Sequence, residues 1–432
     1  MKRNDLGRRE FLRYSAAGAA LAVSGSNILA SEHRTAVQET DHADESITTE
    51  TDVLVVGGGT AGTVAAIQAA RAGAKTFLME RGTQLGGTTT TGGVAFPGLF
   101  HAWGKQIISG IGWELVVDSV MLDGGRLPDF SLEINNTTVR HWRHQVHVNP
   151  FLYSLLAEEK CEEAGVEIAF YESPRAIEKT GEGWQVDCIG FGTRRRVRCK
   201  QIIDCTGGAE VAGLLNFPRL RGEETQPGSI LFQLDKANNP GRPNGPGTGT
   251  LNALYVHGAD SSNSRTVTAA NLAGRKAILE KVRKEEKRLM HLQPEVAFRE
   301  SYRIEGETVI TVDDYTSGRV FEDAVCYAFY PVDLHTKEGV RPKPLTRGTV
   351  PTIPLSALIP NDSRNILVAG RCVSSDRLAN SGLRVQAPCM AMGQAAGVTA
   401  ALAARGETTP MEVPLKDVRE MLMQHGAIVP GI

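Results

Sequence analysis

The sequence predicts an α/β fold in which a parallel sheet is assembled from both ends of the chain, with a mixed α+β domain inserted between them. Near the N-terminal end, the short apolar run at residues 52–56 is typical of a buried parallel strand. A helix at 60–72 and a strand at 75–80 then complete a βαβ unit. Near the C-terminal end, a strand at 365–369 and a helix at 385–404 return to the same pattern.

Composition limits the class of protein. The chain has 432 residues, of which 41% are hydrophobic and 22% are charged, as in an ordinary globular protein. The formal net charge of -2 gives no indication of a nucleic-acid partner, and we expect none. The seven cysteines include no Cys-x-x-Cys pair, which argues against a redox dithiol and a clustered zinc site. We therefore expect no metal.

The middle of the chain supplies the remaining expected elements. Helices are expected at 104–123, 150–163 and 266–291. Strands are expected at 167–171, 185–189, 196–199, 201–204, 309–312 and 324–330. The segment Gly-Pro-Gly-Thr-Gly-Thr at 245–250 lacks a preceding strand and a closing glycine, so we interpret it as a loop rather than a second dinucleotide site.

The beginning of the chain carries a different pattern. The order Arg-Arg-x-Phe-Leu at residues 8–12, followed by a mildly apolar stretch rich in alanine and glycine, resembles the twin-arginine export signal. We interpret 1–30 as this signal peptide, with cleavage after Ala30; the alternative is an N-terminal helix or a basic surface patch. Residues 31–51 are polar and acidic, and we expect a disordered linker there.

A glycine motif follows the first expected strand. Gly57, Gly59 and Gly62 form Gly-x-Gly-x-x-Gly between that strand and the helix. The first glycine permits a tight turn, the second lets the backbone approach a pyrophosphate, and the third lets the helix pack closely on the strand. Glu80 ends the next strand, at the usual distance for a carboxylate that accepts ribose hydroxyls. This arrangement predicts a Rossmann-like dinucleotide site.

The loop after this carboxylate favours FAD over NAD. Gly86-Gly87 and Gly92-Gly93 follow it closely, and a nicotinamide-binding domain has no need of such a loop. In a flavin enzyme, this loop wraps the pyrophosphate and reaches the isoalloxazine ring.

Two further motifs fit a bound nucleotide. The strand at 201–204 ends in Asp-Cys-Thr-Gly-Gly, whose small residues suit a strand end pressed against the cofactor. The strand at 365–369 leads through Gly370 to a helix that begins near Val385. The positive end of that helix dipole would stabilise negative charge on a reduced flavin.

Taken together, these motifs resemble the FAD-dependent oxidoreductase family whose nucleotide domain is of the glutathione-reductase type. The resemblance rests on the stretches 80–94, 202–212, 301–314 and 353–397. It covers residues 52–405, is loose between 100 and 149, and departs from the family's acidic turn at 208–210. It implies a Rossmann-like FAD-binding domain, an inserted substrate domain and FAD as the cofactor.

The domains implied are a FAD-binding domain at 52–98, 150–219 and 347–410, a substrate or cap domain at 99–149 and 220–346, and a C-terminal tail at 411–432. We expect contacts with FAD from Gly57, Gly59, Thr60, Ala61, Gly62, Glu80, Arg81, Gly86, Gly87, Thr88, Ala176, Thr206, Gly207, Gly370, Arg371, Arg384, Val385 and Gln386.

Three residues are candidates for catalysis. His101 follows the flavin loop, as an acid/base group or a covalent flavin anchor, with plain packing as the alternative. His141, His144 and His147 have a spacing of three that would hold a metal on a helix, but the intervening residues favour an extended pocket wall, so we select His141. Arg384 precedes the flavin-facing helix and would hold an anionic substrate group or the flavin; the alternative is a salt bridge.

The predicted function is an FAD-dependent oxidoreductase that transfers a hydride between flavin and a small polar organic substrate while a general base moves a proton. The alternatives are net elimination or isomerisation on the same fold, or a non-catalytic flavin-bearing module. The predicted location is the periplasm, reached through the twin-arginine machinery. There the electron acceptor would be oxygen, a quinone or a small redox protein.

Overall fold

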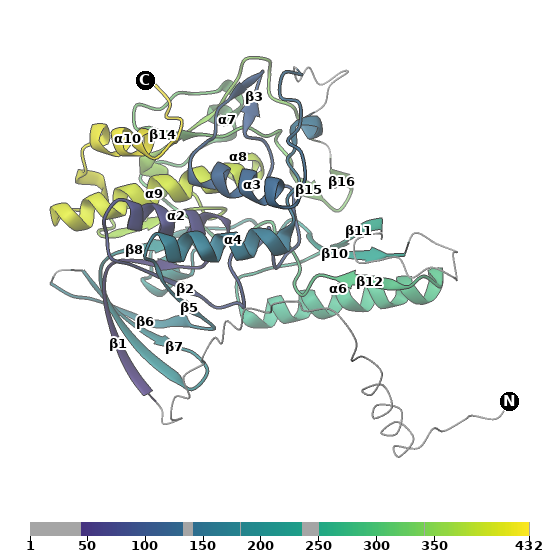
Figure 1. Cartoon of the computed structure of the whole chain (residues 1–432), viewed down its shortest axis with the longest axis horizontal. Coiled ribbons are helices and arrows are strands. Elements are labelled where there is room, and N and C mark those ends of the chain that lie inside the picture. Colours follow the sequence, from purple (N-terminus) through teal and green to yellow (C-terminus); the bar gives the residue numbers. More distant parts are fainter. Residues whose placement is uncertain (1–44, 133–140, 182, 236–249, 341, 432) are drawn as a thin grey trace, which may run out of the picture. The chain divides into compact units, whose positions relative to one another are not determined.

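The computed structural model describes residues 45–132, 141–181, 183–235, 250–340 and 342–431 (Figure 1). The signal peptide predicted at 1–30 and most of the predicted linker lie outside the described residues. Residues 245–249 of the Gly-Pro-Gly-Thr-Gly-Thr segment also lie outside them.

A parallel sheet forms the centre of the described chain. Strand β1 (Glu45–Val56) lies between β2 (Thr76–Glu80) and β8 (Thr193–Asp204), and both neighbours are parallel to it. Strand β5 (Glu167–Phe170) pairs with β2, and β18 (Ile366–Val368) pairs with β8, again in parallel. The prediction of an α/β fold is therefore correct, and strands from distant parts of the sequence share one sheet.

The sheet continues as an antiparallel extension that the sequence analysis described incorrectly. Strand β7 (Trp184–Ile189) pairs with the first half of β8 and with β6 (Ser173–Lys179), a strand that was not predicted. The two strands predicted at 196–199 and 201–204 are one continuous strand, β8. Its first half also pairs with residues 45–51, which were predicted to be a disordered linker.

Two alanine-rich helices pack against each other on the parallel sheet. Helix α2 (Thr60–Arg71) and helix α9 (Gln386–Gly406) lie side by side in Figure 1. A Cβ atom at Gly393 would overlap the backbone of Ala61, so only glycine permits this approach. Helix α9 is long and apolar enough to cross a membrane, but 94% of that stretch is buried in the fold, as in a core helix.

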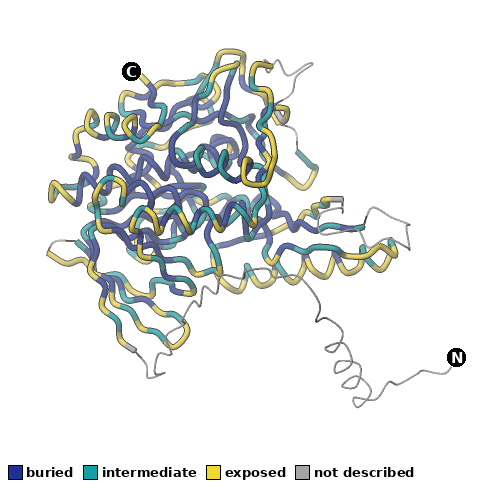
Figure 2. Tube along the Cα trace, in the orientation of Figure 1, coloured by how far each residue is buried: buried dark blue, intermediate teal, exposed yellow. Residues whose placement is uncertain are grey.

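A second, smaller sheet has its own core. Strand β10 (Gly228–Leu234) pairs antiparallel with β11 (Thr250–Val256) and β12 (Leu289–Leu292). Helix α6 (Ser264–Glu285) packs against β10 and β11 around Ile230, and its outer side is exposed (Figure 2). The helix predicted to reach residue 291 is therefore too long, because the chain turns and enters β12.

Shorter elements complete the fold. The remaining helices are α3 (Ile111–Leu122), α4 (Pro150–Glu163), α5 (Glu210–Leu214), α7 (Val312–Ser317), α8 (Arg377–Leu383) and α10 (Leu415–Gln424), with the 3-10 turns η1 (His141–His144), η2 (Leu355–Leu358) and η3 (Pro410–Glu412). The remaining strands are β3 (His101–Ala102), β4 (Lys105–Gln106), β9 (Arg219–Leu220), β13 (Arg303–Ile304), β14 (Ala324–Tyr327), β15 (His335–Thr336), β16 (Gly339–Val340) and β17 (Thr352–Pro354).

Three further predictions of secondary structure need correction. The helix predicted from 104 begins only at Ile111, because Gly110 precedes it in a left-handed conformation with φ of 85°. The strand predicted at 309–312 is wrong, because Ile310 forms only an isolated bridge with Ser375 and Thr311 caps helix α7. The predicted tail at 411–432 contains α10, whose residues Val418 and Leu422 are buried in the main core.

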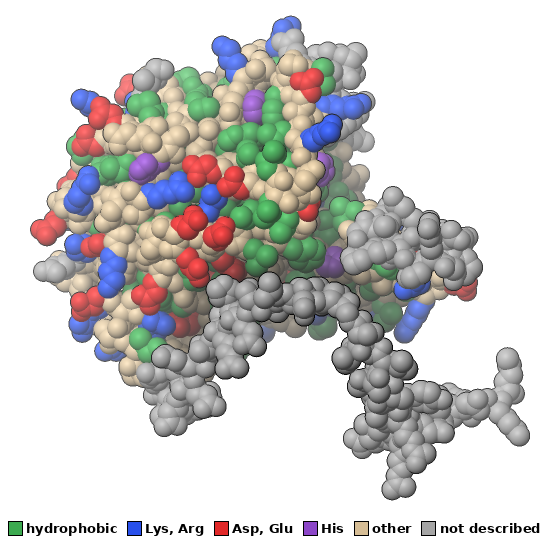
Figure 3. Space-filling view, in the orientation of Figure 1, with side chains coloured by type: hydrophobic (Ala, Val, Ile, Leu, Met, Phe, Trp, Pro, Cys, Tyr) green, Lys and Arg blue, Asp and Glu red, His purple; other side chains and the backbone are tan. Residues whose placement is uncertain are grey.

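The visible face of the molecule carries both signs of charge. Acidic and basic side chains are interspersed over it, with apolar side chains between them (Figure 3). Several of the larger exposed apolar residues come from the end of α3 and the start of α4, including Leu122 and Phe151.

Candidate active site

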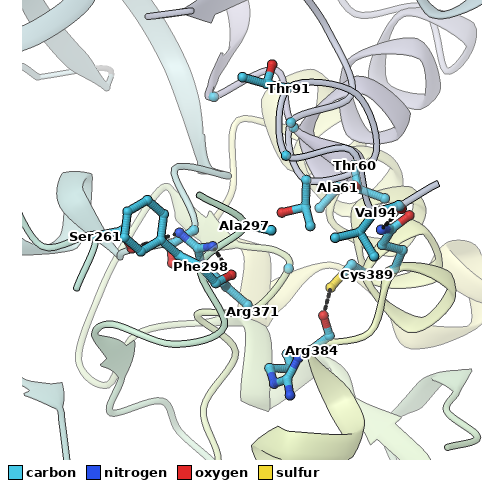
Figure 4. Close-up of a pocket in the computed structure, with 18 of the residues that line it drawn as sticks. Thr60, Ala61, Thr91, Val94, Ser261, Ala297, Phe298, Arg371, Arg384 and Cys389 are labelled. Carbon is cyan, nitrogen blue, oxygen red and sulfur yellow. Dashed lines mark hydrogen bonds between the residues drawn. The ribbon is translucent and has the colours of Figure 1, made fainter. Parts of the chain in front are cut away.

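A cavity of about 620 Å³ opens where the carboxyl ends of the parallel strands meet the smaller sheet. It is lined by the loops after β1 and β2, the end of β8, the start of α9, and residues of the β10 region. In Figure 4, Thr91, Thr60 and Ala61 lie toward the top of the view, and Arg384 lies toward the bottom. We call these two parts the glycine end, around Gly57–Ala61, and the arginine end, around Arg384.

The glycine end is shaped by backbone contacts that exclude side chains. Gly57 has φ of +99°, and a Cβ atom there would lie 2.6 Å from the Cys205 carbonyl oxygen. A Cβ atom at Gly62 would overlap the carbonyl oxygen of Gly57. At Gly59, by contrast, the nearest atom to such a Cβ would be the Gly87 Cα at 4.0 Å. Gly59 therefore keeps space free in the cavity at the N-terminus of α2.

The carboxylate of Glu80 organises the loop around this end. One oxygen accepts the Gly58 N–H and the other accepts the Gly82 N–H, both at 2.6 Å. Burial raises the pKa of Glu80, and the two backbone hydrogen bonds oppose that shift. The next residue, Arg81, forms an ion pair with Glu210 at 2.7 Å and also lines the cavity.

The glycine-rich loop after β2 is tied to the start of α9. The Thr89 hydroxyl donates to the Gln386 side-chain oxygen at 2.7 Å, and the Gln386 amide donates to the Val94 carbonyl at 2.8 Å. Thr60 donates to the Gly86 carbonyl at 3.2 Å. Residues from opposite ends of the chain are thus joined at the cavity wall.

Arg371 connects the main sheet to the smaller one. Its guanidinium donates to the Gly207 carbonyl at 2.5 Å, the Phe298 carbonyl at 2.8 Å and the Ser261 hydroxyl at 2.9 Å (Figure 4). Burial lowers the pKa of Arg371. The nearby Asp204 carboxylate is bonded within its own turn, where it accepts the N–H groups of Thr206 and Ala212, so Asp204 has a structural role.

The arginine end is a cluster of charged and polar side chains. Asp333 pairs with His335 at 3.0 Å between Oδ2 and Nε2, and it lies 3.8 Å from the Arg384 guanidinium. Arg384 also donates from Nη2 to the Gln226 side-chain oxygen and the Asp333 carbonyl, both at 3.3 Å. Arg299 donates from Nη1 to the Pro227 carbonyl at 2.6 Å.

Protonation states follow from burial and from these partners. Burial acts to raise the pKa of Asp333, but the hydrogen bond from His335 and the charge of Arg384 lower it overall, so the carboxylate is ionised. Burial lowers the pKa of His335, which is therefore neutral near pH 7. Burial and the charge of Arg384 lower the pKa of Arg299 to about 10. Both arginines still carry a positive charge at neutral pH.

Most of the residues predicted to contact FAD line this cavity. They are Gly57, Gly59, Thr60, Ala61, Glu80, Arg81, Gly87, Thr88, Thr206, Gly207, Gly370, Arg371, Arg384, Val385 and Gln386. Gly62 and Gly86 lie behind the wall, where they permit the close backbone packing. Ala176 is exposed on β6 away from the cavity, and Glu172, Ser173 and Pro174 line it instead.

The structure describes the side chains of two of the three candidate catalytic residues, His101 and Arg384. His101 stacks on Phe130 with ring centroids 3.7 Å apart, and it is not among the lining residues. Burial and the neighbouring His144 lower its pKa to about 4. The side chain of His141 lies outside what the structure describes. Arg384 lines the cavity.

Four residues that complete the arginine end were not predicted from the sequence: Arg299, Tyr330, Asp333 and His335. Of the described histidines, only His335 lines the cavity. The string Tyr-x-x-Asp-x-His at 330–335 was the available signal, because it places three ionisable groups at and just after the end of an expected strand.

A family model described as FAD dependent oxidoreductase matches residues 52–243 and 231–422. The chain belongs to the FAD-dependent oxidoreductase family. FAD is therefore its cofactor, and the protein is an enzyme of the oxidoreductase class. The matched segments include both the glycine end and the arginine end of the cavity.

The solved structures that resemble this chain are only distantly similar to it. OxyS anhydrotetracycline hydroxylase from Streptomyces rimosus is 14% identical with a TM-score of 0.46, covering 88% of this chain and 66% of that one. A flavoprotein/dehydrogenase from Cytophaga hutchinsonii is 15% identical with a TM-score of 0.40, covering 86% of this chain and 82% of that one. The chain spans only 66% of the length of the hydroxylase, and 63% of the length of two further structures, those of BexE and AlpK.

The residues at the glycine end fit FAD. The space beside Gly59 and the N-terminus of α2 suit a pyrophosphate, because first-turn N–H groups point toward a ligand there. Glu80 ends β2 beside this turn, where its carboxylate can reach a ribose. The cavity volume also falls within the usual range of ligand sites, roughly 300–1,000 Å³.

Proposed function

We propose that this enzyme oxidises or reduces a small polar organic substrate by hydride transfer, with the substrate at the arginine end of the cavity. The observation that carries the proposal is the continuity of one cavity from the glycine turn at Gly59 to Arg384 and His335. When bound, FAD supplies the two-electron acceptor or donor. The protein's own groups bind the substrate, orient it and move a proton.

His335 and Asp333 are the acid–base pair in this proposal. The Nε2–H of His335 donates to Asp333 Oδ2, which fixes the imidazole, while burial keeps the imidazole neutral near pH 7. A neutral imidazole beside an ionised carboxylate can take up a proton and share the resulting charge with that carboxylate. Arg384 and Arg299 orient polar groups of the substrate.

The reaction is tested by mixing the FAD-loaded protein with candidate substrates in the absence of oxygen. A substrate that is oxidised bleaches the flavin absorbance, and re-addition of oxygen, a quinone or a small redox protein identifies the acceptor. Turnover without any change in flavin redox state would instead favour elimination or isomerisation. A His335→Gln variant should keep its FAD but lose most of the rate, because the proton acceptor is removed.

We also propose a glutathione-reductase-type arrangement of the FAD domain with an inserted substrate domain. Strands β10–β12 and helix α6 come between β8 and β18 in the sequence, and they form a separate sheet with a separate core. This supports the insertion. A structure with FAD bound, in which the flavin ring meets residues of β10, would test the arrangement.

Export is proposed from the Arg-Arg motif at 8–12 and from the way the cofactor site is built. Gly57 and Gln386 belong to the same cavity, so the site is complete only when both ends of the chain have folded together. A route for folded proteins would let FAD bind before export to the periplasm. Replacing Arg8 and Arg9 with lysine should leave the FAD-loaded protein in the cytoplasm; a periplasmic FAD-loaded variant would contradict this.

A further inference from the structure

The arginine end carries more positive charge than the protein itself balances. Arg299 and Arg384 both line the cavity, and the charge of Arg384 lowers the pKa of Arg299, so the two cations repel each other. Asp333 is the ionised carboxylate that faces both of them. Because His335 is neutral, two positive charges meet one negative charge.

The neighbouring ionisable groups do not supply the missing charge. Glu300 is deeply buried, but it is paired with Arg377 at 3.0 Å and also accepts the Gln226 side-chain amide at 2.7 Å. Burial raises the pKa of Tyr330 to about 12, so its hydroxyl is protonated at neutral pH. One positive charge therefore remains without a counter-ion in the described part of the cavity.

Each arginine also has hydrogen-bond donors left over. A guanidinium has five N–H groups in a planar fork. Among the hydrogen bonds of the described residues, Arg384 uses only Nη2 and Arg299 only Nη1. The Arg384 side chain is only 11% exposed, so leaving its donors without an acceptor is costly. The unused donors therefore need an acceptor from a ligand.

We propose that Arg299 and Arg384 together bind a carboxylate of the substrate, which makes the substrate an organic acid. A carboxylate is planar and matches the fork of a guanidinium through paired hydrogen bonds. It would also supply the negative charge that this end lacks. The assignment rests on the proposed function only in naming the bound anion as substrate; the anion site itself is tested by binding alone.

The test uses the FAD-loaded full-length protein and acetate as the probe. Acetate should perturb the flavin absorbance spectrum in a saturable way, while acetamide, its neutral isostere, and chloride at equal ionic strength should not. Arg384→Gln and Arg299→Gln should each raise the half-saturating acetate concentration at least tenfold, since each removes charge-assisted hydrogen bonds. Equal responses to acetate and acetamide, or unchanged acetate binding in both variants, would overturn the proposal.

Three controls keep the result interpretable. Arg265→Gln removes an exposed arginine at the start of α6 and should leave acetate binding unchanged. Arg384→Lys keeps the charge but not the fork, so it should bind acetate more weakly than the native protein and more tightly than Arg384→Gln. If inorganic phosphate binds more tightly than acetate and the same variants lose it, the group recognised is a phosphoryl group and the carboxylate assignment is wrong.

The binding result is separable from the proposed reaction. Saturable acetate binding that depends on both arginines, without any carboxylic acid that bleaches the flavin, would support the anion site and contradict hydride transfer. Bleaching only by uncharged compounds, without acetate binding, would support the proposed reaction and overturn the anion site.

Discussion

The two ends of the cavity are built in different ways. At the glycine end, Gly57, Gly59 and Gly62 lie within one turn, and the atoms that they must avoid belong mainly to neighbouring backbone. At the arginine end, Gln226, Arg299 and the Asp333–His335 pair come from separate segments and meet only in the folded chain. The first end depends on local geometry, and the second depends on the packing of two sheets.

The largest effect on FAD content and stability should come from substitutions at the glycine end. Gly62→Ala places a methyl group against the Gly57 carbonyl, so we expect loss of FAD together with a large loss of stability. Gly59→Val meets little protein and fills the space at the start of α2, so we expect loss of FAD with a stable apoprotein. FAD content by absorbance and thermal unfolding of the apoprotein distinguish these outcomes. Gly181→Ala, where no atom lies near the added Cβ, is the control.

The next largest effect tests whether Arg371 holds the main sheet and the smaller sheet together. Arg371→Leu leaves two carbonyls and one hydroxyl without their donor, so the free energy of unfolding should fall by about 3 kcal/mol. We expect chemical denaturation to show this decrease. The free energy of unfolding of Arg371→Lys should lie between those of Arg371→Leu and the native protein. If the free energy of unfolding of Arg371→Leu is native, the two sheets are joined by other contacts.

These differences explain what the sequence could predict. The glycine turn and the strands around it were predicted because backbone sterics leave few residues able to occupy Gly57 and Gly62. The start of β1 was missed because residues 45–51 lie in the exposed extension of the sheet, where polar residues such as Glu50 pair with Arg198 instead of forming an apolar run. Their composition alone indicated a linker.

The arginine end was predicted only in part, for a different reason. Arg384 was selected because it stands just before a helix, which is a local feature. Arg299 has no local feature that separates it from other polar residues, and although His335 stands in the string Tyr-x-x-Asp-x-His, the roles of both depend on a tertiary contact. His101 was selected for its closeness in sequence to the flavin loop, but the chain turns it toward Phe130.

A smaller effect, on the pH dependence of stability, tests the finding that His101 lies outside both ends of the cavity. Its pKa of about 4 lies below the value of 6.5 in the unfolded chain, so the unfolded state binds more protons and stability falls as the pH drops from 6.5 toward 4. At pH 5 this corresponds to about 2 kcal/mol. His101→Phe should reduce the loss of stability between pH 8 and pH 5, measured by denaturation, while FAD content and turnover stay native. A large loss of turnover in this variant would instead indicate that His101 takes part in the reaction.

The smallest effect concerns Glu80, at the edge of the glycine end. Its two carboxylate oxygens each accept one backbone N–H, from Gly58 and Gly82. In Glu80→Gln, one oxygen becomes an NH₂ group that cannot accept, so one of the two loop contacts is lost and a ribose contact is weakened. We expect the Kd for FAD to rise about tenfold, or about 1.4 kcal/mol, in a fluorescence titration of the apoprotein. Glu210→Gln, which removes only the partner of Arg81, should change it less. An unchanged Kd in Glu80→Gln would mean that the loop is held by its glycines alone, and the glycine end would then owe its shape to sterics without help from this carboxylate.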